Sequence, residues 1–511
     1  MLSKLFDFIL LDRFKKWFTP ADEQTAYQEE KGGADHVFLL RCMLQHAKKY
    51  KVKLFLVAID FDGAFDRVSR AVLIRKLCLF GAGTVFTACL ASIYMSTDNV
   101  IFRDTAHVTY KLYSGIKQGL PLSPYIFIFY INDIFDFFGA IYDGGKKAYD
   151  FLHLLVHADD ATVIACDRLS VMNKLRSLLC YCNQNCIIPQ YTKCEFMVTN
   201  GTDADHLPIP FGTGDLKSVE HILLLGSHLT SCASVQIELE LHMTKRYVSV
   251  IKFYNFMRSN KAAPIQVKLK VLRSCVMGSL LYNCETFGSV IPVGLELVYR
   301  KMLKCCLNVR HNVPNLTLYV ETGFLPIRTL ILARQWKFYK RFLGSLAQQS
   351  RRQKMLQYLL QHKTPFLQHY ENLSKKYNSA DDIIKEGRSE VKRLIGLRVS
   401  KNQYKFKMYV DINPELTISP FLYVVHPLAN ELVKLRLGSH YFPIETGRWN
   451  RTPRQNRICT VCNELGDEKH FIYKCPVISR ENIVLDDDIS KIWEHCSIYD
   501  LARQLKENEY L

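Results

Sequence analysis

The chain has 511 residues, 48% of them hydrophobic, which is long enough to form several domains. Its 67 lysines and arginines against 49 aspartates and glutamates give a formal net charge of +18, which favours a polyanionic partner such as a nucleic acid but also fits a merely basic soluble protein. The 17 cysteines are odd in number and scattered, which argues against a disulfide framework and against secretion, and predicts a reducing, nuclear and cytoplasmic location.

No signal peptide or membrane span is expected. The apolar N-terminal stretch is interrupted by Asp7 and is followed by no small-residue cleavage site, so it predicts an amphipathic helix. No uncharged run reaches the roughly 20 residues that a bilayer requires, so a membrane is not expected among the partners.

The first part of the chain predicts an α+β layer. Residues 4–50 are mostly helical in pattern, and residues 53–60 form a β-prone run that ends at an acid, as a buried strand would. The order β-α-β-α-ββ-α-β-β predicts helices packed on an antiparallel sheet. The further expected elements are a helix (70–83), a hairpin (99–116), an apolar helix (122–138), a second hairpin (155–165), a helix (168–186) and two strands (193–199 and 221–229).

Two adjacent aspartates, Asp159 and Asp160, stand in the second hairpin, within "HADD". Adjacent carboxylates repel each other unless a cation lies between them, so this is either a solvated turn or a cation site. Two other stretches accompany it: "AIDFDGAFDRV" (58–68) and "GIKQGLPLSPYIF" (115–127). Alone, each is more often a turn, a cap or a core segment, but their order and company favour a single site.

Together the three stretches resemble the reverse transcriptases of non-long-terminal-repeat (LINE-type) retrotransposons. They match the family patterns D-x-x-x-A-F-D, G-x-x-Q-G-x-x-L-S-P-x-x-F and Y/F-A-D-D. The resemblance covers nearly the whole chain in order. It extends to a fingers motif (23–41), a lysine-containing palm strand (191–198), a primer-grip turn (223–229) and a distal region (434–462).

The resemblance implies a right-hand polymerase that copies RNA into DNA, with RNA template, DNA primer or target, and dNTPs as partners. It divides the chain into partial fingers and palm (1–233), a helical thumb (234–345), a connecting helical or linker region (346–432) that includes "QQSRRQK", and a basic region (433–511). Because the first fingers strands of the family have no counterpart, an N-terminally truncated copy is expected.

Nucleotide addition needs an activated 3′-hydroxyl and a neutralised pyrophosphate, and two Mg²⁺ ions can provide both. Mg²⁺ prefers hard oxygen ligands. Asp60, Asp159 and, to a lesser degree, Asp160 are therefore the expected catalytic ligands, joined by the carbonyl of Phe61. Bound metal would relieve the repulsion between the neighbouring aspartates.

The resemblance implies three further roles around the nucleotide. Phe65 would lie under the incoming sugar and reject a 2′-hydroxyl, although it could be a plain core residue. Gln118 and Gly119 would let the backbone approach the template–nucleotide pair, because glycine adds no side chain. Lys193 would lie near the pyrophosphate, with a surface lysine as the alternative.

Two residues depart from the family pattern. Gln28 stands where the family has a fingers arginine, which removes a bidentate phosphate donor. Lys31 is the candidate to compensate for it. His157 replaces the aromatic residue of Y/F-A-D-D, and its charge would vary with pH.

Near the C-terminus, Cys459, Cys462, His470 and Cys475 follow the spacing C-x2-C-x7-H-x4-C. Three thiolates and an imidazole suit one tetrahedral Zn²⁺, and scattered buried cysteines are the alternative. The flanking cations and Trp449 suit contact with nucleic-acid backbone and bases. These cations are Lys434, Arg436, Arg448, Arg451, Arg454 and Arg457.

The sequence thus predicts a retrotransposon reverse transcriptase. The first alternative is a catalytically inactive retroelement-derived protein that only binds nucleic acid. The second is an RNA-dependent RNA polymerase, which Phe65 and the Gln-Gly pair disfavour. The host, the template, the target site and the oligomeric state stay open.

Overall fold

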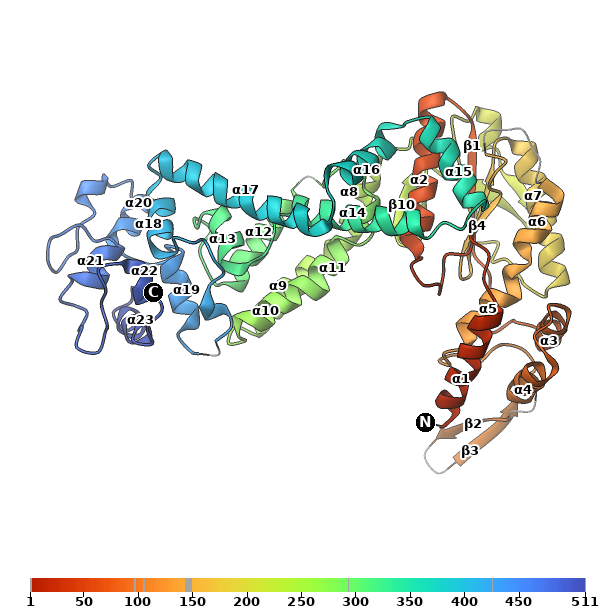
Figure 1. Ribbon diagram of the computed structural model, residues 1–511, viewed down its shortest axis with the longest axis horizontal. Coiled ribbons are helices and arrows are strands. Elements are labelled where there is room, and N and C mark those ends of the chain that lie inside the picture. The colour runs from red at the N-terminus through yellow and green to blue at the C-terminus, as the bar shows by residue number, and fades with distance from the viewer. Residues whose placement is uncertain are drawn as a thin grey trace. The chain divides into compact units, whose positions relative to one another are not determined.

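The protein is described by a computed structural model for residues 2–95, 98–103, 106–142, 149–292, 294–424 and 426–510 (Figure 1). It folds into two compact units. The first unit comprises Met1–His242, Glu285–Val290 and Gln335–Lys376. The second unit comprises Met243–Cys284, Ile291–Arg334 and Tyr377–Leu511.

A six-stranded sheet forms the centre of the first unit. Strand β1 (Leu54–Ile59) lies between β5 (Asp160–Ala165) and β6 (Glu195–Thr199) and is antiparallel to both. Residues 54–57 of β1 are fully buried, as expected for a strand covered on both faces. Strand β4 (Leu154–His157) pairs with β5 and closes the expected hairpin.

The far edge of this sheet contains two strands that the sequence pattern did not predict. They are β7 (Ile209–Phe211) and β8 (Gly214–Ser218), and β8 runs parallel to β6, so the sheet is not purely antiparallel. Strands β9 (His221–Leu224) and β10 (Ser227–Thr230) form a separate hairpin. The α+β class is confirmed.

Helices of the first unit surround the sheet. Apolar side chains from α2, α5, α6 and α7 make up much of its core. The bounds are α1 (Leu2–Trp17), α2 (Gly33–Tyr50), α3 (Arg70–Leu79), α4 (Thr84–Met95), α5 (Ser123–Asn132), α6 (Ile134–Tyr142), α7 (Arg168–Gln184), α15 (Arg351–Gln361) and α16 (Pro365–Lys376), with the hairpin β2 (Asp98–Arg103) and β3 (Ala106–Lys111).

Helices α5 and α6 together cover Ser123–Tyr142, the one single helical stretch among the described residues that is long and apolar enough to cross a membrane. More than half of it is buried inside the protein. Asp133 lies between the two helices, where it pairs with Lys76 (2.7 Å) and accepts a hydrogen bond from Tyr181 (2.5 Å). The core helix of a soluble protein meets the same test of length and composition.

The second unit is helical, as the pattern beyond residue 234 predicted. Helix α8 (Val235–Arg246) begins in the first unit, and α14 (Ile327–Gly344) carries the chain back to it. The other main helices are α9 (Val248–Ser259), α10 (Ile265–Val271), α12 (Leu295–Cys306), α13 (Asn315–Thr322), α17 (Ala380–Ser400), α18 (Tyr404–Ile412), α19 (Ala429–Arg436), α20 (Pro443–Trp449), α21 (Glu468–Tyr473) and α23 (Ile498–Glu507). The four functional segments expected from the sequence stay a prediction.

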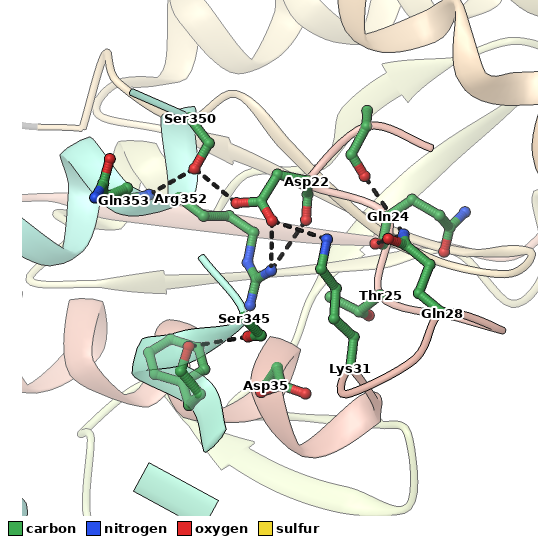
Figure 2. A network of polar contacts seen from close by, with 12 residues as sticks. Asp22, Gln24, Thr25, Gln28, Lys31, Asp35, Ser345, Ser350, Arg352 and Gln353 are labelled. Atoms are coloured by element: carbon green, nitrogen blue, oxygen red, sulfur yellow. Dashed lines mark hydrogen bonds and ion pairs between the residues drawn. The ribbon is translucent and has the colours of Figure 1, made fainter. Parts of the chain in front are cut away.

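The segment "QQSRRQK", expected to be a linker or an exposed face, instead holds the first unit together (Figure 2). Arg352 is fully buried in α15 and donates to the Oδ1 (3.2 Å) and the carbonyl (3.0 Å) of Asp22. Lys31 pairs with the same Oδ1 at 2.8 Å, and the Ser350 hydroxyl donates to Oδ2 at 2.6 Å. The expectation was wrong because a partner more than 300 residues away neutralises the arginine.

We expect Arg352→Leu to lower the free energy of unfolding by about 3 kcal/mol at pH 7, because it removes one partner of a buried ion pair. Chemical denaturation of the first unit measures this change. The exposed pair Lys16–Asp12 provides the control, since Lys16→Gln should cost at most about 0.5 kcal/mol. A loss no larger than that of the control would contradict the anchoring role.

The same anchor predicts a dependence on pH. Burial raises the pKa of Asp22, but Arg352, Lys31 and Ser350 outweigh burial and leave the pKa below its ordinary value. The stabilisation is therefore present above the unfolded pKa of about 3.9 and is lost as the pH falls through the lower folded value. The difference in unfolding free energy between the wild type and Arg352→Leu should therefore narrow as the pH falls below about 4.

Candidate active site and metal-binding cluster

Three acidic residues converge at one end of the central sheet. Asp60 directly follows β1, and the register that pairs Ile59 with Ala161 places Asp60 beside Asp160. Asp159 lies in the turn between β4 and β5. Burial raises the pKa of Asp160 to about 6, and the negative charges of Asp159 and Asp60 add to the increase. The three carboxylates therefore lie near enough for their charges to affect one another.

The turn that carries Asp159 is held by a loop from the start of the chain. Ala158 has a φ of +57°, which is uncommon for a residue other than glycine. Its N–H donates to the side-chain oxygen of Gln24 at 3.0 Å. Thr25, which follows Gln24 in the chain, donates its N–H to the carbonyl of Val156 at 2.9 Å. Gln24 and Thr25 therefore fix the position of the aspartate pair, a role that no local sequence signal indicated.

The two departures from the family pattern lie on this loop or in contact with it. His157 shares a hydrogen bond of 2.9 Å with the Thr25 hydroxyl, and burial lowers the pKa of His157, so its imidazole is neutral near pH 7. The Gln28 side chain donates to the carbonyl of Gln24. Lys31 is only 10% exposed and pairs with Asp22, so the expectation that Lys31 compensates for the absent arginine is wrong (Figure 2).

Backbone contacts join the first and second motifs. The carbonyl of Phe65 accepts a hydrogen bond from the Ile116 N–H at 3.0 Å, and the Phe65 ring stacks on Phe127, with ring centres 4.6 Å apart. Gly115 has a φ of +83°, and a Cβ there would lie 2.8 Å from the carbonyl oxygen of Asp66. Only glycine fits so close to that backbone.

The remaining predicted residues lie around this core. Gln118 is exposed and donates to the Asp66 carboxylate at 2.9 Å, while Gly119 has a φ of +86° with open space beside it. Lys193 lies 3.2 Å from the Asp60 carboxylate, which places it at the acidic site. Phe61 is buried, and its backbone forms a bridge to Pro189.

The four C-terminal residues also come together, in the second unit. The candidate ligand atoms of Cys459, Cys462, His470 and Cys475 all lie within 4.8 Å of one another. The three sulfurs are 3.6 to 3.8 Å apart, and Nε2 of His470 lies 3.3 Å from the sulfur of Cys462. Two thiolates bound at about 2.3 Å to a tetrahedral ion lie about 3.8 Å apart, so the cluster fits Zn²⁺.

A second layer orients this cluster. The other ring nitrogen of His470 lies 3.3 Å from the Glu464 carboxylate, which directs Nε2 towards the sulfurs. Hydrogen bonds from main-chain N–H groups at residues 461 and 462 and from neighbouring side chains lower the pKa of Cys459 despite its burial, whereas burial raises the pKa of Cys462 and Cys475. Cys459 is therefore the thiol of the cluster that most readily forms the thiolate that a metal requires.

Comparisons with solved structures return telomerases at low similarity. Apo telomerase from Candida tropicalis aligns at 12% identity with a TM-score of 0.35, over 70% of this chain and 60% of that one. Telomerase from Candida albicans with a fragment of telomeric RNA aligns at 12% identity with a TM-score of 0.34, over 76% and 58%. Scores of this size establish nothing about this chain.

Sequence comparisons point to the first unit. A Transposon TX1 uncharacterized 149 kDa protein from Xenopus laevis is 25% identical over 182 residues, which cover 35% of this chain and 14% of that protein. Residues 1–229 match the family described as reverse transcriptase (RNA-dependent DNA polymerase). This range contains Asp60, Asp159 and Asp160. The first 229 residues are therefore similar to a reverse transcriptase domain.

Proposed function

We propose that the protein is the RNA-directed DNA polymerase of a non-LTR retrotransposon. The observation that carries the proposal is the convergence of Asp60, Asp159 and Asp160 at one end of a sheet within the reverse transcriptase domain. The similarity to a transposon protein supports the type of element. RNA template, DNA primer and dNTPs are the proposed partners, in a reducing nuclear or cytoplasmic compartment.

The carboxylates of Asp60 and Asp159, with Asp160, would hold two Mg²⁺ ions. These ions supply Lewis-acid stabilisation of the transferring phosphoryl group and of the leaving pyrophosphate. Burial and the neighbouring carboxylates raise the pKa of Asp160, so a cation at this position would stabilise its charged form. The anchored turn at Ala158 keeps the ligands in place before substrate arrives.

Other residues would position the nucleotide. The Phe65 ring stacks on Phe127 and its carbonyl accepts from Ile116, contacts that would hold the ring against a 2′-hydroxyl. Gly119 leaves open space where a base pair could approach the backbone. Lys193 lies at Asp60, from which it could turn to a pyrophosphate oxygen as countercharge or proton donor.

One observation favours the alternative of an inactive nucleic-acid-binding protein. The fingers motif lacks its arginine at Gln28, and Lys31 is committed to Asp22. Primer extension on poly(rA)/oligo(dT) with Mg²⁺ separates the two functions. Incorporation of dTTP supports the polymerase, whereas duplex binding without incorporation supports the alternative. Incorporation of ribonucleotides in preference to dNTPs would indicate an RNA polymerase.

We expect Asp159→Asn to reduce primer extension by about 10³-fold or more while leaving nucleic-acid affinity nearly unchanged, because it removes a metal ligand and no cation. Single-turnover extension and a binding titration measure the two quantities. Asp215→Asn makes the same chemical change on an exposed residue of β8 and should keep full activity. Extension by Asp159→Asn above about a tenth of the wild-type rate would refute the metal assignment.

We expect Phe65→Val to relax the preference for dNTP over rNTP by about 10- to 200-fold, the usual effect of a change in pocket volume. The measurement is the ratio of kcat/KM for dTTP and UTP in the same preparation. This ratio is insensitive to the fraction of folded enzyme. An unchanged ratio would show that Phe65 only packs on Phe127.

We propose that the Cys459 cluster binds about one zinc ion per chain, and that Cys462→Ser abolishes this binding and disorders the local segment. Metal analysis of reduced protein measures the zinc content, and Cys496→Ser, an exposed cysteine outside the cluster, is the control. Extension on a pre-annealed duplex should persist in Cys462→Ser, while nucleic-acid binding should weaken. Zinc-free wild-type protein would refute the site.

A further inference from the structure

The second unit contains a cavity of about 660 Å³ that is lined by four cations and no acidic side chain. Arg300 comes from α12, Arg398 from α17, Lys405 from α18 and Arg448 from α20. These helices are up to about 150 residues apart in the sequence, so no local motif indicated the cavity. Only Arg448 belongs to the basic stretch beside the cysteine cluster.

The carboxylates next to the cavity lining neutralise these cations only in part. Glu445 is 1% exposed and serves two of them, Lys405 at 2.7 Å and Arg448 at 3.0 Å. Glu296 pairs with Arg300 at 3.3 Å. Glu468 is a third acid whose charge acts on Lys405, so four cations face three carboxylates. Arg398 is exposed on α17. The wall keeps a surplus of positive charge.

Lys304, which does not line the cavity, gives further evidence of this surplus of positive charge. Its ammonium donates to the carbonyl of His311 at 2.6 Å. Burial lowers the pKa of Lys304 to about 8, and the positive charges of Lys405 and Arg300 contribute to the decrease. Three cations are thus held close together, which is unfavourable unless an anion joins them.

Two helices begin at the cavity. The start of α13, at Pro314 and Asn315, and the start of α18, at Gln403 and Tyr404, both line it. Neither helix has a side-chain cap. The first N–H groups of a helix and its dipole favour anions, so both helices add to the effect of the four cations.

The surrounding side chains are fixed. The Tyr404 hydroxyl donates to Glu468 at 2.8 Å, and the same carboxylate binds His440 at 2.9 Å. The guanidinium of Arg454 lies 4.0 Å from the centre of the Tyr404 ring. An aromatic ring beside several arginines is the arrangement that binds sugar-phosphate backbone and stacked bases.

We infer that this cavity binds the phosphodiester backbone of a nucleic-acid strand. The inference rests on the proposed function only for the identity of the polyanion, since the site is far in sequence from the polymerase residues and contains none of them. It is also distinct from the zinc cluster, because three of its four cations lie outside the basic stretch.

The test compares Arg398→Gln with Lys385→Gln in the full-length protein. Both residues are exposed on α17, and 13 helical positions at about 1.5 Å each separate them by about 20 Å. The probes are a labelled single-stranded RNA, a single-stranded DNA of the same sequence and a DNA duplex. Arg398→Gln should lower the slope of log K against log salt by about 0.7 for the single strands and about 0.9 for the duplex.

Photocrosslinking locates the contact. RNA with 4-thiouridine should crosslink to peptides that contain 314–316 or 403–406, and Arg398→Glu should abolish these crosslinks. Equal slopes for Arg398→Gln and Lys385→Gln, or crosslinks only elsewhere in the chain, would overturn the inference. So would protection of these peptides by inorganic phosphate or polyglutamate but not by unlabelled RNA. If Arg398→Gln lowers the salt slope for RNA alone, or for DNA alone, the result identifies the strand that the cavity binds and upholds the inference.

Primer extension on a pre-annealed duplex separates this inference from the proposed function. Lys385→Gln, outside the cavity, should extend at the wild-type rate, whereas Arg398→Gln should need a higher duplex concentration to reach half of its maximal rate. If the wild type binds through the cavity but never extends a primer, the proposed polymerase fails and the cavity stands. If extension is normal and the salt slopes do not differ, the cavity fails and the polymerase stands.

Discussion

The antiparallel pairing of β1 with β5 is the contact on which the candidate active site depends. It joins residues about 100 positions apart and brings Asp60 to the turn that carries Asp159. A slip of one residue would turn every side chain of β1 to the opposite face of the sheet, where it would meet different packing partners. The fully buried core of β1 therefore fixes the register, and the register fixes the carboxylates.

That pairing alone would leave three negative charges at an unsupported turn. The support comes from the loop at residues 20–31, which binds the turn through Gln24 and Thr25 on one side. On its other side the loop is held by Arg352 through Asp22 (Figure 2). A buried ion pair is stable only while both partners are in place, so Asp22 needs Arg352. Helix α15, far along the chain, therefore helps to hold the loop that supports the aspartates.

The sequence predicted the parts of the site whose chemistry restricts the residue type. Carboxylates suit Mg²⁺ and closely spaced thiolates suit Zn²⁺, so these candidate ligands can be proposed from a single chain. The close approach of Gly115 to the backbone of Asp66 became evident only in the structure. The sequence did not predict contacts that depend on distant partners. The residues next to Lys31 in the sequence do not show whether its side chain contacts a phosphate or Asp22. Likewise, nothing in "QQSRRQK" indicates that its second arginine is buried. Strand β8 pairs with β6 in parallel, a pairing that alternation of side chains does not indicate.

The location of the acidic residues determines how much of the net positive charge of the chain faces solvent. In the second unit several glutamates are buried and each serves more than one partner. Glu321, fully buried in α13, binds Arg436 at 2.9 Å and the Tyr409 hydroxyl at 2.9 Å, which fixes α13 against α18 and α19. The buried Glu468 keeps a pKa of about 2 through His440 and Tyr404, although burial opposes this. A glutamate that is buried against an arginine or a tyrosine inside the unit does not neutralise cations at the surface. The cations that line the cavity therefore outnumber the acids beside them, and their positive potential attracts a polyanion from solvent.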